Sequence, residues 1–339
     1  MTSSRAFALG ALAAGALLAA APARADSVAD FYTGKTIRVL IGVGEGGGFD
    51  LQARLIARHM RAHIPGQPNL VPQNMAGAGG LNMANYLYNV APKDGTAIGM
   101  MLNSVVALQA TEGRGVNFDA DKMAWIGSPE RMIVAVYALK ASGILTIDDV
   151  RRKPAIAAAT AKGAITYITP HLMNELLGTK FKIITGYQGS ASLLLAVERG
   201  EADAALEAWP SFKTRKPDWF AQNKVSILVH SGPREGELAG IPTFQELARS
   251  DDDRRIIGLV MSGNDLGKPL AAPPGVPAER IDALRRAFDE TMKDPDYLKE
   301  AANMGFDVAP VRGEALQRIT HGVLATPKSL IARAKEIME

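Results

Sequence analysis

A glycine-rich stretch near the N-terminus, IGVGEGGGFDLQARL at residues 41–55, has residue types and spacing that can bind an anion. Gly42, Gly44 and Gly47 form a G-x-G-x-x-G pattern between a strand-like run and a helix-like run. Glycines before a helix leave backbone N–H groups uncovered, and these groups together with the helix dipole attract negative charge. The stretch therefore predicts an anion site, for a nucleotide or for another ligand.

A nucleotide would need further residues that this chain lacks. A dinucleotide site requires an acidic residue about 20 positions after the glycines to bind the ribose. No Asp or Glu lies between Asp50 and Asp94, and no Gly-Lys-Ser/Thr triplet occurs in the loop. A nucleotide-dependent enzyme is therefore the least favoured alternative, and we expect no cofactor.

Two further loops have a similar arrangement. Residues 75–80, MAGAGG, and residues 160–166, TAKGAIT, each contain glycine and lead toward a helical run. We expect the three loops to meet at a cleft and to hold a carboxylate from both sides. The alternative for each loop is a tight turn that glycine makes possible.

No catalytic apparatus is visible in the chain. His59 and His63 have the i, i+4 spacing of metal ligands, but they lack the glutamate of an HExxH motif, so we interpret them as surface residues. The serine in GYQGSAS is displaced from the Gly-x-Ser-x-Gly nucleophile pattern. We therefore predict a binding protein with no catalytic residue and no metal.

Strand-like and helix-like runs alternate along the chain, which favours mainly parallel sheets with ligand loops at the carboxyl ends of the strands. Asp50 and Ser190 are placed to cap helices, and Pro277 to begin one. Strands are expected at residues 36–44, 69–74, 96–102, 132–139, 155–160, 181–187, 202–208 and 225–230, and helices at 51–64, 81–91, 170–177, 190–200 and 281–294.

Polar side chains follow some of these strands. Asn103 and Ser104 end the third strand, where side chains commonly line a site. Glu207 and Trp209 follow a strand of the second half and are further candidates, although an aromatic residue such as Trp209 is more often used in packing. Ser190 is interpreted as a helix cap in preference to a ligand contact.

The N-terminus predicts export from the cytoplasm. Residues 1–25 contain one early arginine, a short apolar run and the small-residue site Ala23-Arg24-Ala25, which is typical of a signal peptide cleaved before Asp26. The alternative, a retained membrane anchor, would need a run of about 20 apolar residues. Among the 339 residues there is no cysteine, which excludes disulfides and suits a bacterial periplasm.

The charge pattern argues against a nucleic-acid partner. The formal net charge of +3 falls to +1 when Arg5 and Arg24 are removed with the signal peptide, since no acidic residue leaves with them. The lysines and arginines are dispersed and form no dense basic run. We therefore expect a small-molecule ligand.

Five long motifs in order, spanning essentially the whole mature chain, resemble the extracytoplasmic solute receptors of tripartite tricarboxylate transporters, known as the Bug family. They are GEGGGFDLQARLIARHM, PGQPNLVPQNMAGAGG, YNVAPKDGTAIGM, GTKFKIITGYQGSASLLLAVERGEADA and APPGVPAERIDALRRAFDETMKDP. The resemblance implies a two-lobed α/β periplasmic binding protein of type II, with lobes joined by crossover strands. We assign residues 26–130 and 227–339 to lobe 1 and residues 131–226 to lobe 2.

The resemblance also implies the ligand contacts. The first and second loops would hold a carboxylate through backbone N–H groups and water, and the third loop would meet the rest of the ligand. With the strand-end candidates, the predicted site comprises Gly46, Gly47, Gly48, Phe49, Asp50, Gly77, Ala78, Gly79, Asn103, Ser104, Gly163, Ala164, Thr166 and Glu207.

The chain departs from the family pattern at three positions. Glu45 stands where a proline is usual, and Ala161 and Ala164 replace a glycine and a serine, so Lys162 or Thr166 would have to supply the polar contact. The resemblance implies a monomer that delivers its carboxylate to a membrane permease. Presentation of the ligand to a sensor protein is the alternative.

Overall fold

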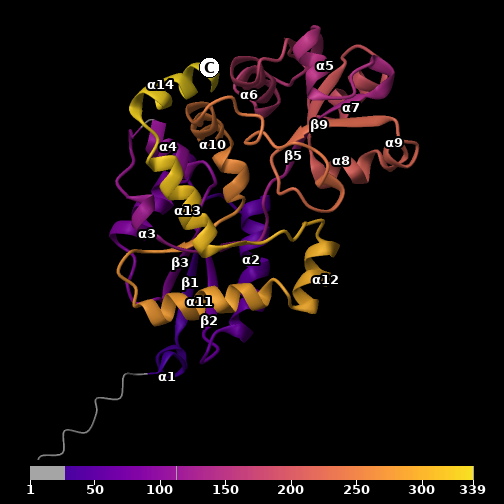
Figure 1. The fold of residues 1–339 in the computed structure, drawn as a ribbon. Coiled ribbons are helices and arrows are strands. Elements are labelled where there is room, and N and C mark those ends of the chain that lie inside the picture. The colour runs from indigo at the N-terminus through magenta and orange to yellow at the C-terminus, as the bar shows by residue number, and fades with distance from the viewer. Residues whose placement is uncertain (1–26, 112, 339) are drawn as a thin grey trace, which may run out of the picture.

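The computed structural model describes residues 27–111 and 113–338, so the predicted signal peptide lies outside the described residues. Two β-sheets occupy separate halves of the molecule (Figure 1). Around the second sheet lie α5 (Ile147–Arg152), α7 (Ser190–Glu198), α8 (Trp209–Arg215) and α9 (Pro217–Ala221). Within the described ranges, no helix is both long enough and apolar enough to cross a membrane.

The first sheet has six strands in the order β11-β4-β10-β3-β1-β2. β1 pairs in parallel with β2 and with β3, whereas β10 is antiparallel to both β3 and β4. The sheet is therefore mixed, with β10 and β11 reversed relative to the other four strands. The strands are β1 (Thr36–Ile41), β2 (Asn69–Asn74), β3 (Ala97–Met100), β4 (Ala124–Ser128), β10 (Leu270–Ala272) and β11 (Val311–Arg312).

Buried apolar side chains on both faces of β1 explain why helices cover both faces of this sheet. Ile37, Val39 and Ile41 pack into a core with residues of α2 and α11, while Leu40 faces a second core with residues of α3. Successive side chains of a strand point to opposite faces, so a strand with buried apolar side chains on both faces needs cover on both. The helices of this half are α1 (Val28–Tyr32), α2 (Gly48–Met60), α3 (Leu81–Asn89), α4 (Val105–Thr111), α10 (Asp251–Leu266), α11 (Ala278–Thr291), α12 (Pro295–Asn303), α13 (Gly313–Leu324) and α14 (Lys328–Met338).

The second sheet has five strands in the order β7-β6-β8-β5-β9. β6 is parallel to β7 and β8, and β5 runs antiparallel to its neighbours β8 and β9. Its strands are β5 (Val134–Leu139), β6 (Ala155–Ala158), β7 (Phe181–Ile184), β8 (Ala204–Ala208) and β9 (Val225–His230). Its helices are α5 (Ile147–Arg152), α6 (Ile165–Leu172), the π-helical turn Met173–Leu177, α7 (Ser190–Glu198), α8 (Trp209–Arg215) and α9 (Pro217–Ala221).

The chain passes between the sheets twice, at residues 129–133 and at residues 231–250. The first strand after the first passage is β5, and the first strand after the second passage is β10. Each of them lies between two neighbours and runs antiparallel to both. Parallel pairing is therefore incomplete in both sheets. The second sheet extends to His230, so the predicted boundary after residue 226 falls within β9, and the division into lobes stays a prediction.

Several helices differ from the sequence-based expectation. α2 begins at Gly48 with Gly47 as its N-cap, so Asp50 lies in the first turn and is not the cap. α6 begins at Ile165, ahead of the expected start at Pro170, and Pro170 is accommodated inside the helix. Residues 251–266, where no element was expected, form α10.

Candidate functional site

The first glycine-rich loop is held by the carboxylate of Asp50. This side chain is 2% exposed and accepts hydrogen bonds from the Gly46 N–H at 2.8 Å, Arg54 Nε at 2.9 Å and Asn74 Nδ2 at 2.9 Å. Burial alone would raise the pKa of Asp50, but the hydrogen bonds from Arg54, Gly46 and Asn74 together hold it below its usual range. Asp50 was predicted to contact the ligand, whereas its oxygens are occupied in organising the loop.

Backbone donors of this loop remain available. In the described part of the chain, the N–H groups of Gly47, Gly48 and Phe49 donate to no protein acceptor. They lie at the N-terminus of α2, where the helix dipole adds partial positive charge. This geometry favours a carboxylate or another small anion.

The second loop lies against the first. A Cβ at Gly42 would stand 3.6 Å from the Cα of Gly80, and both positions contact Leu102. Gly77 and Ala78 have φ of +122° and +48°, which turns the chain sharply before α3. The N–H groups of Gly77, Ala78 and Gly79 also have no acceptor among the described residues. The structure thus brings the first two predicted loops together.

The residues after β3 differ in role. Asn103 donates from Nδ2 to the carbonyl of Gly263 at 3.0 Å, which ties the end of β3 to α10. Ser104 is half-buried and precedes α4, and its hydroxyl makes no hydrogen bond within the ranges that the structure covers. Ser104 is therefore better placed than Asn103 to meet a ligand.

The third loop closes on itself through two threonines. Thr166 Oγ1 accepts a hydrogen bond from the Thr160 N–H at 3.0 Å and lies 2.9 Å from Thr160 Oγ1. Gly163 has a φ of +80°, and Ala164 is the N-cap of α6. The loop is preformed, but the Thr166 hydroxyl is engaged inside it.

Glu207 is buried at the end of β8. It is 5% exposed, and its Oε1 accepts from Ser190 Oγ at 2.9 Å while Arg215 lies 3.8 Å from Oε2. Ser190 is the first residue of α7 and Gly189 is the N-cap, so the predicted capping role of Ser190 is wrong. The Ser190 hydroxyl donates its hydrogen bond to Glu207 instead. A cavity of about 400 Å³ opens beside this point, lined by Arg215 and residues 188–192.

The two sheets are not joined at the predicted site in this structure. Over residues 27–111 and 113–338, no hydrogen bond or ion pair connects the first two loops with the third loop or with Glu207. The contacts between the halves lie elsewhere: α14 packs against α6, and Arg333 pairs with Glu175. The common cleft therefore stays a prediction.

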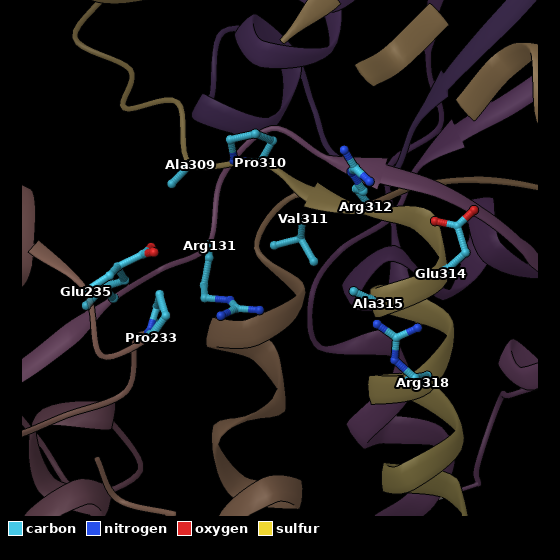
Figure 2. A pocket seen from close by; sticks show the side chains of 11 residues that line it. Arg131, Pro233, Glu235, Ala309, Pro310, Val311, Arg312, Glu314, Ala315 and Arg318 are labelled. Carbon is cyan, nitrogen blue, oxygen red and sulfur yellow. The ribbon is translucent and has the colours of Figure 1, made fainter. Parts of the chain in front are cut away.

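A cavity of about 530 Å³ lies on the β11 side of the first passage between the sheets and contains none of the predicted site residues. Arg131 and Arg318 extend into it from opposite sides (Figure 2). Arg131 Nε lies 3.7 Å from Asp265 Oδ1, and burial raises the pKa of Asp265 despite that arginine. The cavity and the glycine-rich loops are thus separate features.

Sequence reasoning missed a charged pair beside the first loop. Lys268 Nζ lies 2.8 Å from Glu130 Oε1, with the two side chains 13% and 18% exposed. The same ammonium is 5.8 Å from the ring centroid of Phe49. Lys268 and Glu130 are far apart in the sequence and belong to no motif, so no local signal could have indicated their pairing.

The two spaced histidines pair with different carboxylates. His59 Nε2 lies 2.7 Å from Glu300, and His63 Nε2 lies 2.9 Å from Asp294. These contacts join α2 and the turn after it to the α12 region, so the histidines are partly buried rather than simply exposed. Among the described side chains, no group of three His, Asp or Glu residues is placed to hold a metal ion.

Comparison with known proteins identifies the relatives of this chain. The family described as tripartite tricarboxylate transporter family receptor matches residues 52–335. The protein in the gbd 5′ region of Cupriavidus necator is 29% identical over 308 residues, covering 86% of this chain and 84% of that protein. Protein BugT of Bordetella pertussis is 24% identical over 304 residues, covering 86% of each chain.

Solved structures support the same fold. A solute-binding protein from Polaromonas, determined without ligand, has a TM-score of 0.66 at 16% identity, covering 91% of this chain and 99% of that chain. An R. palustris protein determined with adipate has a TM-score of 0.50 at 17% identity, and the match covers 89% of this chain and 97% of that chain. The predicted two-lobed α/β fold of periplasmic binding proteins is confirmed, as is the family resemblance.

Proposed function

Because this chain belongs to the tripartite tricarboxylate transporter receptor family, we propose that it captures a small carboxylate in the periplasm and delivers it to a membrane permease. The ligand would bind between the loops of the first sheet and those of the second. The predicted signal peptide would direct export, and the mature chain would begin at Asp26 and act as a monomer.

The observation that carries this proposal is the set of uncovered N–H groups on two adjacent loops. Gly47, Gly48 and Phe49 begin α2, and Gly77 to Gly79 precede α3, with no protein acceptor for these donors in the described chain. The hydrogen bond between Asp50 and Asn74 fixes the positions of the two loops relative to each other. Rigid donors of this kind bind an anion with little loss of conformational freedom.

The second sheet would contact the remainder of the ligand. Its candidates are Gly163, Ala164 and Thr166 on the third loop, with Glu207 beside α7. A ligand that touches both sheets favours the arrangement in which they approach, by its differential affinity for that state. Closure would exclude water and strengthen each hydrogen bond from the loops.

Binding of a carboxylate agrees with one solved structure of this fold. The R. palustris protein whose structure is similar was determined with adipate, a dicarboxylate. A receptor that presents its ligand to a membrane sensor would need the same binding chemistry, so it remains the alternative for the downstream partner. A nucleotide-dependent enzyme is disfavoured because no acidic residue lies between Asp50 and Asp94.

A thermal-shift screen of the chain from Asp26 onward tests the proposal. The panel contains succinate, malate, adipate, benzoate and glutamate, with NAD and ATP as controls. A ligand at 100 times its Kd stabilises the folded state by about 2.7 kcal/mol, which raises Tm by a few degrees. A carboxylate response with silent nucleotides is expected, and a response to nucleotides alone would overturn the proposal.

A further inference from the structure

Lys268 and Glu130 form a shielded ion pair in the first sheet, where the interior strand β4 ends and its neighbour β10 begins. Nζ and Oε1 are 2.8 Å apart, and the side chains are 13% and 18% exposed. Lys268 lies just before β10, and Glu130 lies on the first passage between the sheets. Shielded charges interact more strongly than exposed ones, so this pair holds a defined position.

The ammonium of Lys268 lies beside the start of α2. Nζ is 3.8 Å from the point where a Cβ of Gly48 would stand. It also lies 5.8 Å from the ring centroid of Phe49 and 5.1 Å from that of Phe306. A full positive charge therefore stands next to the uncovered N–H groups of Gly48 and Phe49.

We propose that Lys268 is a ligand-binding residue that exchanges Glu130 for the carboxylate of the ligand. This inference rests on the proposed function, because it assumes that the carboxylate lies at the first loop. Without ligand, Glu130 compensates the lysine charge. With ligand, the ammonium turns to the carboxylate held by the N–H groups of α2, and a charge-assisted hydrogen bond is added.

The backbone around the pair is fixed, so the exchange needs only side-chain movement. Ser128 Oγ accepts from the Lys268 N–H at 2.9 Å and donates to the Glu130 carbonyl at 2.7 Å. A Cβ at Gly267 would stand 1.8 Å from that carbonyl oxygen, so the two segments touch directly. Lysine has a flexible side chain that can turn between two acceptors while its backbone stays in place.

The position of Glu130 links the exchange to the lobes. Glu130 belongs to residues 129–133, which connect β4 with β5 of the second sheet. Loss of its lysine partner when ligand binds changes the electrostatic environment of this connection. The ion pair is thus placed where ligand capture and the relative position of the sheets can influence each other.

Three variants test the exchange by calorimetric titration with adipate and with the other panel carboxylates. Lys268→Gln removes the ammonium, and Glu130→Gln removes the competing carboxylate. Lys216→Gln is the matched control, because Lys216 also pairs with a glutamate, Glu198 at 2.7 Å, and also lies over an aromatic ring, Trp219 at 4.8 Å. Thermal melting of each variant reports whether it is folded.

The exchange predicts opposite effects for the two partners. Lys268→Gln should weaken carboxylate binding about 10- to 100-fold, since a charged hydrogen bond is lost. Glu130→Gln should strengthen binding several-fold, because Lys268 no longer has a competing acceptor, and Lys216→Gln should leave the Kd unchanged. A purely structural pair would instead make both variants weaken binding alike or leave it unchanged, and either result overturns the exchange.

Failure of the exchange and failure of the proposed function give different results. If the wild-type protein binds a panel carboxylate and Lys268→Gln binds it equally well, only the exchange is wrong. If the folded wild-type protein binds no carboxylate of the panel, the proposed function is overturned, and the role of Lys268 falls with it.

Discussion

Asn74 donates a hydrogen bond from Nδ2 to Oδ1 of Asp50 at 2.9 Å, and its Nδ2 also donates to the carbonyl of Val43 at 3.0 Å. These contacts join the end of β2 to the loop after β1 and to the first turn of α2. Parallel neighbouring strands place their carboxyl ends at the same edge, so one amide can hold two loops. The loops are therefore positioned before any ligand arrives.

We expect Asp50→Asn to destabilise the protein by about 1 to 3 kcal/mol, because a buried charged acceptor of three hydrogen bonds is lost. The measurement is urea unfolding at pH 7. Asp251→Asn is the control, since Asp251 also lies in the first turn of a helix and pairs with an arginine, but its side chain is 88% exposed. A surface pair of this kind contributes about 0 to 1 kcal/mol. Equal effects of both substitutions would contradict the role assigned to Asp50.

The same variant has a pH signature. The pKa of Asp50 in the folded state lies below its ordinary 3.8, so its stabilising contribution is present above about pH 4 and is lost as the pH falls through the folded value. The stabilities of Asp50→Asn and the wild-type protein should therefore converge in strong acid. A constant difference down to pH 2 would argue against the lowered pKa.

Gly47 is a better position than Gly77 for testing whether the first glycine-rich loop binds a carboxylate. Its φ is −82°, its ψ is 166°, and no atom lies within 4 Å of a Cβ built there, so Gly47→Val should fold. At Gly77 a Cβ would stand 2.3 Å from Asn82 Nδ2 at a φ of +122°, so any side chain there also strains the fold. We expect Gly47→Val to weaken carboxylate binding at least tenfold, about 1.4 kcal/mol, by covering the backbone donors.

Gly44→Val is the matched control for that substitution. Gly44 is exposed in the same loop, and a Cβ there also meets no atom within 4 Å. Titration with whichever carboxylate of the thermal-shift panel binds the wild-type protein should give the wild-type Kd for Gly44→Val and a raised Kd for Gly47→Val. Wild-type affinity in a folded Gly47→Val protein would remove the first loop from the site.

Local sequence patterns predicted where the strands lie better than they predicted which strands pair and in which direction. The run that begins at Thr36 forms β1 because consecutive apolar and β-branched residues are a local signal, and the short segment NLVPQN forms β2 as expected, although its residues are exposed or half-buried. The reversed direction of β5 and β10 depends on where the chain returns from the other sheet, which no short window encodes. Parallel pairing was therefore overestimated.

For the candidate site, the sequence predicted the backbone donors but not the roles of the side chains. Glycine spacing located the backbone donors of the first two loops, because uncovered N–H groups before a helix follow from the sequence. Side-chain roles could not be read in this way. Asp50 and Asn103 are engaged by Asn74 and by the Gly263 carbonyl, and Lys268 meets Glu130 only through the fold.

Gly267 marks the contact between the segment before β10 and the first passage between the sheets. Its φ is +62°, and a Cβ there would stand 1.8 Å from the Glu130 carbonyl oxygen. We expect Gly267→Ala to lower the free energy of unfolding by about 3 kcal/mol or more. The backbone at Glu130 would have to move away from the new Cβ, and the alanine would hold a strained positive φ. Urea unfolding measures this loss.

Gly236→Ala separates backbone strain from the clash. Gly236 has a similar φ of +55° but no atom within 4 Å of a Cβ, so this control should cost only about 1 to 2 kcal/mol. If Gly267→Ala were no worse than Gly236→Ala, the close contact between the two segments would not exist in solution.

His230 is a buried histidine, and we expect it to make the stability of the protein sensitive to mild acid. The side chain is 0% exposed, its Nδ1 accepts the Gly232 N–H at 3.1 Å, and its Nε2 lies 3.1 Å from the Ile241 carbonyl. Nδ1 can accept only while it is unprotonated, so the proton of the neutral ring sits on Nε2. Burial lowers the pKa of His230 below its ordinary 6.5.

Stability should therefore fall as the pH decreases through about 6.5, because the unfolded chain takes up a proton that the folded chain resists. Melting temperatures between pH 8 and pH 5 measure this. His230→Gln cannot take up the proton, so it should be less stable at pH 8 but should show a flatter dependence below pH 6.5. His321→Gln is the control, because His321 is 70% exposed, and it should keep the wild-type profile. A His230→Gln protein as acid-sensitive as the wild type would place the responsible group elsewhere.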